Sequence, residues 1–203
     1  TACTSAGKTG TLIIRESNNL SWGGGTYTIL AMQGAKVTIN GGSVKNCGGD
    51  ALSLAISIHH PNTSATLNDG LLYCENYYAI RTYACGGPVA FVQNGGTVSG
   101  TGAIFQHANP DGSHITINDG RLIGRTGRGF YVWGNSVQDK DKVYIAVNGG
   151  EIQAATDLCH FYGTAAEGIV QYSFSGGTVT AGGNFATNRF SQHVLITGGT
   201  YNK

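Results

Sequence analysis

Charged residues are scarce in this sequence. Asp, Glu, Lys and Arg make up 11% of its 203 residues and leave a formal net charge of +1, whereas they form roughly a quarter of an ordinary globular domain. A chain so close to neutral offers no basic surface to the phosphates of a nucleic acid or to an anionic membrane. We therefore expect no nucleic-acid partner.

Long apolar runs and helix-forming runs are missing as well. No stretch approaches the ~20 apolar residues of a membrane-spanning helix, so no membrane insertion is expected in this segment. Proline occurs only three times, and no Pro/Ser-rich linker divides the chain, which predicts a single domain. Few charges and many Gly, Thr, Ser and Asn favour a β protein that is rich in corners.

Glycine is in excess, at 33 residues, and much of it belongs to one recurring phrase. The phrase has alternating apolar residues, a small polar residue, Gly or Asp, Gly, a spacer and a further apolar residue. It occurs at 37–44, 65–72, 91–98, 115–122, 145–152, 172–179 and 194–201. Its closing glycines lie 22 to 30 residues apart, a period typical of stacked supersecondary units.

Each phrase predicts a strand, a sharp turn and a second strand. Val37 and Ile39 alternate with Thr38, the pattern of a strand with one buried face, and Asn-Gly-Gly tolerates the positive φ of a tight bend. Recurrence in one phase favours stacked coils over hairpins, and therefore a parallel β-solenoid of about seven coils. Residues 1–35 are expected to form an irregular first coil or cap, and residues 36–203 the repeats, with an uncapped C-terminal end.

A second recurring segment predicts a third short strand in each coil, at 51–57, 79–85, 103–109, 129–135, 158–164 and 185–191. Its second column is mainly apolar and is predicted to face inward, as is Ile117 in the phrase. A slip by one residue would bury Arg81 and Arg189, so the third and fifth columns are predicted to face outward. Gln93 falls in an inward column of the phrase, which predicts a one-residue bulge.

The outward columns gather rings on neighbouring coils, with Arg and His among them. We call this set the aromatic stripe: Arg81, Tyr83, Phe105, His107, Tyr131, Trp133, His160, Tyr162 and Arg189. Flat rings suit sugar faces, and exposed patches rich in Tyr, Trp and Arg are typical of interaction surfaces. The stripe therefore predicts a site for a glycan or for a host or neighbouring protein. The alternative is a ladder of strand-favouring rings covered by a loop or another domain.

Other candidates for chemistry have simpler explanations. Asp69 and Asp119 share a repeat position and could be compared with a glycosidase pair, but Asp before Gly is a common turn residue. His59 and His60 lie next to each other in a loop and would point apart, which makes a poor chelate. We expect no catalytic residue, metal or cofactor.

Five cysteines are present. Cys47 and Cys74 follow the turn in consecutive coils at nearly the same repeat position, close enough for a disulfide. A bridge between them and two separate thiols remain open alternatives. Cys159 lies in an inward column and is expected to be a buried thiol.

The corners INGG, INDG, VNGG and ITGG resemble the Gly-Gly repeats of adhesin-like surface proteins of Gram-positive bacteria. The resemblance covers roughly residues 24–203 and implies a right-handed parallel β-helix of the pectin-lyase-like type in an extracellular, secreted or cell-surface protein. It implies no catalytic residue. The expected function is therefore ligand binding by a segment of a larger surface protein. Two alternatives stay open, namely a structural subunit that self-associates through the solenoid ends into a fibre and a polysaccharide lyase or hydrolase.

Overall fold

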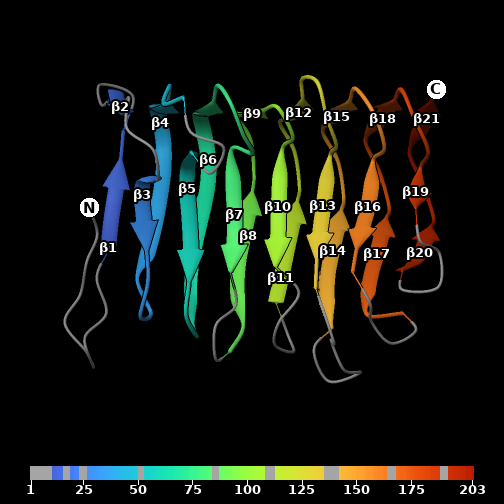
Figure 1. The fold of residues 1–203 in the computed structure, drawn as a ribbon, viewed down its shortest axis with the longest axis horizontal. Coiled ribbons are helices and arrows are strands. Elements are labelled where there is room, and N and C mark those ends of the chain that lie inside the picture. The colour runs from blue at the N-terminus through green and yellow to red at the C-terminus, as the bar shows by residue number, and fades with distance from the viewer. Residues whose placement is uncertain are drawn as a thin grey trace.

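A computed structural model of the chain describes residues 11–15, 19–22, 27–49, 53–83, 87–107, 113–134, 142–163, 168–187 and 192–203. These residues form strands, turns and bends, and no helix occurs among them. The chain winds into a parallel β-solenoid whose strands stack side by side along one long axis (Figure 1). The expected all-β solenoid is confirmed.

Each turn has three legs, and each leg stacks on the same leg of the next turn. The first leg consists of β1 (Thr11–Ile14), the first half of β4 (Lys36–Asn46), the first half of β6 (Thr63–Cys74), β8 (Val89–Gln93), β11 (Ser113–Ile117), β14 (Val143–Val147), β17 (Val170–Phe174) and β20 (Gln192–Ile196). The second leg consists of β2 (Asn19–Trp22), the second halves of β4 and β6, β9 (Thr97–Gly100), β12 (Arg121–Gly124), β15 (Glu151–Ala154), β18 (Thr178–Ala181) and β21 (Thr200–Asn202).

The third leg forms a separate seven-stranded sheet. Its strands are β3 (Tyr27–Ala31), β5 (Leu54–His59), β7 (Ile80–Tyr83), β10 (Ile104–His107), β13 (Phe130–Trp133), β16 (Cys159–Tyr162) and β19 (Ala186–Thr187). In Figure 1 this sheet lies nearer the viewer, and its strands run downward while the chain advances from left to right, so the coil is right-handed. Parallel crossovers almost always adopt that hand.

The number of turns with three separate strands differs slightly from the seven coils expected. Within the described residues, five turns have three separate strands, beginning with β1, β8, β11, β14 and β17. In two further turns the first two legs run through the corner as one long strand, β4 or β6. Residues 1–35 were expected to form an irregular first coil or cap. In their described part β1 and β2 pair with β4, and β3 pairs with β5, all in parallel.

The main core is a column of apolar side chains inside the coil. Inward and outward residues alternate along the strands, as in β11, where Ile117 is 1% exposed. The largest buried rings are Phe91, Phe130, Tyr172 and Phe174. The predicted bulge at Gln93 is wrong, because β8 continues the register of β6 without interruption. Gln93 instead stays inside, and its Nε2 donates to the carbonyl oxygens of Gly96 and Arg121 at 3.3 and 3.1 Å.

The corner phrase recurs because successive corners touch. A Cβ on Gly96 would lie 2.6 Å from the carbonyl oxygen of Gly70 in the previous coil, and Gly96 has a φ of 68°. A Cβ on Gly120 would likewise lie 2.5 Å from the oxygen of Gly96. The closing glycine is therefore required by close approach between coils as well as by its backbone angle.

The small polar residue of each corner phrase forms hydrogen bonds between successive coils. The Nδ2 atoms of Asn68, Asn94, Asn118 and Asn148 each donate to the Oδ1 atom of the Asn one coil earlier, beginning at Asn40, over 2.7 to 2.9 Å. The hydroxyl of Ser175 donates to Asn148 and extends the series. We call the residues Asn40, Asn68, Asn94, Asn118 and Asn148 the asparagine ladder.

Candidate functional site

The outer surface of the third leg carries the aromatic stripe. Parallel register aligns Arg81, Phe105, Tyr131 and His160 in one column, and Tyr83, His107, Trp133 and Tyr162 in a second. The side chains of Phe105 and His107, and all of Arg189, lie outside the described residues. The two columns are therefore those expected from the sequence over β7 to β16.

Exposure varies along the stripe. Tyr162 is 59% exposed, whereas Arg81, Tyr83, Tyr131, Trp133 and His160 are half-buried. Tyr131 and Trp133 pack against a small cluster, separate from the main core, around Leu54 and Tyr78. Part of the stripe is thus held by neighbouring rings, and its outermost ring is Tyr162.

Tyr78, which lies two coils before Tyr131, packs against that residue in the middle of the stripe. Its ring stacks on that of Tyr131, with centroids 5.7 Å apart and planes 19° apart. The ring reaches Tyr131 by passing over Gly102, where a Cβ would lie 2.1 Å from the Tyr78 ring. The guanidinium of Arg128 lies 5.0 Å from the Tyr131 centroid, a cation–π distance. Burial raises the pKa of Tyr78, although a hydrogen bond from Arg128 acts in the opposite direction.

At the N-terminal end of the stripe the structure adds His59. Strand β5 is shifted by four residues from the expected alignment, so that Ser57 pairs with Arg81 and His59 pairs with Tyr83. The expected outward column is wrong in this coil, because Ser53 and Ala55 are fully buried and Ala55 belongs to the core. The His59 ring lies 5.2 Å from that of Tyr83, and its Nε2 is 2.6 Å from the Ser57 hydroxyl. Burial, followed by the nearby Arg81 and His60, lowers the pKa of His59 to about 4.

The opposite end of the stripe carries a polar cluster. The Nδ1 atom of His160 lies 3.3 Å from Asp157 Oδ2 and 2.8 Å from the Thr187 hydroxyl. Both contacts use the same ring nitrogen, whereas a nucleophile–base–acid relay needs the two different nitrogens. The cluster therefore orients the imidazole beside Tyr131, whose ring centroid is 5.5 Å away.

The pKa values of His160 and Asp157 in this cluster are each set by opposing effects. Burial lowers the pKa of His160, and Arg128 adds to this, while Asp157 opposes both. Burial alone would raise the pKa of Asp157, but hydrogen bonds from Asn184 and His160 outweigh it, and the pKa lies below its usual value. Asp157 Oδ1 accepts from both the backbone and side-chain amides of Asn184.

The remaining candidates are placed as follows. Asp69 and Asp119 each accept a 2.7 Å hydrogen bond from the amide of the glycine that follows them, an arrangement typical of turn residues. Among the described residues, no group of three or more His, Cys, Asp or Glu side chains could hold a metal ion. Within the same part of the chain, no helix has the length and apolarity needed to cross a membrane.

The thiols of Cys47, Cys74 and Cys159 are all free in the structure. The register pairs Cys74 with Asn46 rather than with Cys47. Asn46 and Cys74 both face inward and are buried. Because neighbouring residues of an extended segment face opposite ways, Cys47, which follows Asn46, is exposed. The Cys74 thiol donates to the carbonyl oxygen of Ser53 at 2.9 Å. The disulfide considered from the sequence is therefore not formed, and Cys159 is buried as expected.

Sequence reasoning missed several residues of this surface. His59 was assigned to a loop, and Tyr78 and Arg128 lie in the corner before the strands, where alternation gives no facing. The register could have been recovered by matching Ile56 to Ile80, since both precede a polar outward residue.

Compared with family models, with curated proteins and with solved structures, the chain gives no match.

Proposed function

We propose that this chain is a non-catalytic, extracellular ligand-binding segment of an adhesin-like surface protein. It holds a glycan or a partner protein against the aromatic stripe of its third leg. The observation that carries the proposal is the parallel register, which aligns aromatic residues of successive coils in columns ending at the 59% exposed Tyr162. The extracellular location is supported by the resemblance of the corner phrases to surface-protein repeats.

The stripe suits binding because its rings are held in place before a ligand arrives. Stacked parallel strands fix the spacing of successive rings at about 4.8 Å. Tyr131 is packed between Tyr78, Arg128 and His160, so little side-chain freedom is lost on binding. Arg and His beside the rings can donate hydrogen bonds to hydroxyl or carboxylate oxygens.

The test is a binding screen of the wild-type chain against a glycan array and a panel of extracellular-matrix proteins. We expect at least one ligand whose binding weakens about tenfold or more, equivalent to ~1.4 kcal/mol, in Tyr162→Ala. Trp133→Ala should weaken the same ligand while the protein keeps its circular dichroism spectrum.

Thr180→Ala is the control, because Thr180 is exposed on the second leg, outside the stripe. If every ligand found in the screen bound Tyr162→Ala and Trp133→Ala as tightly as the wild type, the stripe would not be the site. Release of reducing sugar or unsaturated uronate from any polysaccharide of the panel would contradict the non-catalytic part of the proposal.

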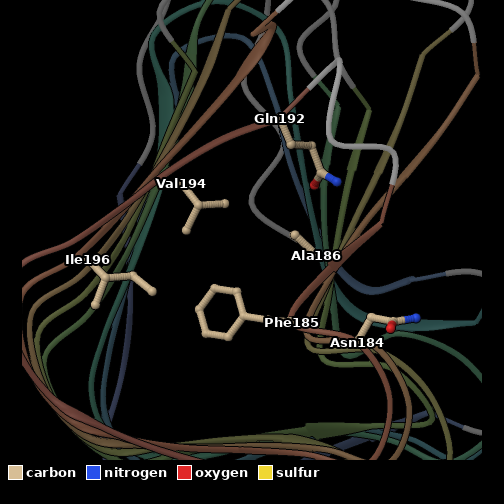
Figure 2. Close-up of a pocket in the computed structure, with 6 residues that line it drawn as sticks. All are labelled: Asn184, Phe185, Ala186, Gln192, Val194 and Ile196. Atoms are coloured by element: carbon tan, nitrogen blue, oxygen red, sulfur yellow. The ribbon is translucent and has the colours of Figure 1, made fainter.

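A second candidate function is end-to-end association into a fibre, and it is favoured by the last described turn. The inward side chains of β20 and of the segment before β19 border a hollow of about 440 Å³. Phe185, Val194 and Ile196 point into this hollow in Figure 2, and Ile196 is 48% exposed. A further turn of β structure could pack on this apolar face.

Sedimentation at increasing protein concentration tests this candidate. If the face binds a second copy of the chain, the wild type should associate, and Ile196→Lys should remain monomeric. Thr180→Lys, an exposed position on the second leg, is the control. A wild type that stays monomeric at high concentration would remove the fibre candidate.

A further inference from the structure

The outer face of the first leg carries a second shallow site, away from the aromatic stripe. A hollow of about 360 Å³ lies over β11, β14 and β17. His114 and Tyr144 border it, and Thr116, Ala146 and Ser173 also line it. The five side chains belong to two outward columns that the parallel register aligns across the three strands.

The two rings form a rigid edge along this hollow. Their centroids are 5.0 Å apart and their planes differ by 13°, so they stack along the solenoid axis. Because Tyr144 covers one face of His114, the other face is directed toward the previous strand, where the register places Ala90. A second hollow of about 260 Å³ lies there, lined by His114, Ala90 and Pro88 among others. A ring face beside a hollow can stack on a further ring, as aromatic side chains prefer.

The asparagine ladder supplies hydrogen-bonding groups two residues beyond Thr116 and Ala146, at about 7 Å, and four residues beyond the two rings, at about 13 Å. A side-chain amide has two N–H donors and an oxygen with two acceptor sites. Asn94 and Asn118 each use one donor and one acceptor within the ladder. Both are exposed, so each coil presents one further donor and one further acceptor to solvent. Hydroxyl groups, which both donate and accept, match such pairs.

The outward residues of the four strands at this site carry no formal charge. From β8, β11, β14 and β17 the outward residues are Ala90, Val92, His114, Thr116, Tyr144, Ala146, Gln171 and Ser173. None of them is Asp, Glu, Lys or Arg. By contrast, Arg81 and Arg128 lie at the aromatic stripe. These eight residues offer no Lys or Arg to a polymer of carboxylates or sulfates.

We infer that this face, between the His114–Tyr144 pair and the asparagine ladder, is a second binding site, and that its ligand is a neutral linear glycan lying along the solenoid axis. Sugar rings stack against His114 and Tyr144, and hydroxyls pair with the ladder amides. This site is independent of the aromatic stripe, since the two lie on different sheets.

Affinity electrophoresis of the intact chain in gels that contain soluble neutral glucans, mannans or xylans tests the inference. We expect retardation by at least one of them. Thr116→Arg places a long side chain in the hollow and should abolish the retardation, and Tyr144→Ala should weaken it about tenfold or more. Because no formal charge takes part, binding should be nearly equal at about 0.15 M and about 1 M salt.

Thr180→Arg, the same substitution on the second leg, is the matched control and should bind like the wild type. Tyr162→Ala should also bind normally, which separates this site from the stripe. Three results would each overturn the inference: no retardation by any neutral glycan, equal retardation of Thr116→Arg, or preferential salt-sensitive binding of alginate or polygalacturonate. Sedimentation that shows a dimer broken by Thr116→Arg would assign the face to a second copy of the chain instead.

Discussion

At the scale of single residues, the aromatic stripe depends on groups that do not belong to it. Tyr131 is held by Tyr78 from two coils earlier, and that contact exists only because Gly102 leaves room for the ring. Gly102 is therefore needed for the packing of the Tyr78 side chain rather than for a turn. A substitution of Gly102 should alter the stripe although Gly102 is not one of its residues.

We expect Gly102→Ala to displace Tyr78 from Tyr131, because the new Cβ would lie 2.1 Å from a Tyr78 ring carbon. Overpacking of this kind costs about 1–3 kcal/mol. The tyrosine bands of the near-ultraviolet circular dichroism spectrum should change, and the melting temperature should fall. Gly49→Ala is the control, since a Cβ there meets nothing within 4 Å. Equal spectra for Gly102→Ala and the wild type would mean that Tyr78 does not lie over Gly102.

The low pKa of His59, about 4 against an ordinary 6.5, makes stability depend on pH. Between these two values the unfolded chain binds a proton that the folded chain does not, so the stability contributed by neutral His59 is complete above about pH 6.5 and is lost as the pH falls toward 4. We expect the melting temperature to fall more steeply on acidification from about pH 7 to about pH 5 in the wild type than in His59→Gln. Parallel curves for the two proteins would contradict the burial of this imidazole.

At the scale of elements, the corner is the unit that repeats. It combines a glycine that touches the previous corner with an asparagine that hydrogen-bonds to the previous asparagine. The corners therefore stack through close backbone contact and side-chain hydrogen bonds, in addition to the parallel pairing of the strands. The strands also supply the buried apolar column, and outward residues such as Tyr162 lie outside it.

The ladder can be tested at Asn118, which donates to Asn94 at 2.8 Å and accepts from Asn148 at 2.9 Å. Asn118→Ala removes both bonds and should lower the free energy of unfolding by about 1–2 kcal/mol, because each exchanges with water and is worth about 1 kcal/mol. Urea denaturation measures the change. Thr180→Ala, at another exposed position, should alter stability far less. Equal effects of the two substitutions would show that the ladder contributes nothing.

At the scale of the whole molecule, the solenoid is a stack in which each turn contacts its neighbours. Deletion of residues 97–120 removes one full turn and joins Gly96 to Arg121, so that β12 would occupy the place of β9. Because stability in such stacks is a sum over turns and their interfaces, we expect the shortened chain to keep the β spectrum and one cooperative transition with a lower midpoint.

Deletion of residues 97–108, about half a turn, is the matched comparison. It would bring unlike legs together and misplace every later inward residue, so this chain should not fold. Circular dichroism and urea denaturation of both proteins provide the measurement. If the half-turn deletion folded as well as the full-turn deletion, the stacking of equivalent legs would not be what holds the molecule together.

The amino-acid sequence by itself determined the β-solenoid, the corners and the inward columns. Alternation along a strand is a local property, so Ile117 could be placed inside and Tyr162 outside from their neighbours alone. The closing glycine of each phrase was likewise predicted from turn chemistry, although its contact with the previous coil was not.

The tertiary structure alone decided which side chains meet across coils. The register of β5 depended on where the extra residues of that coil lie, which local alternation does not record. The reach of Tyr78 over Gly102, the stacking of His114 on Tyr144 and the separate thiols of Cys47 and Cys74 all follow from that three-dimensional pairing. A parallel stack brings together residues more than twenty positions apart, and no local pattern records those contacts.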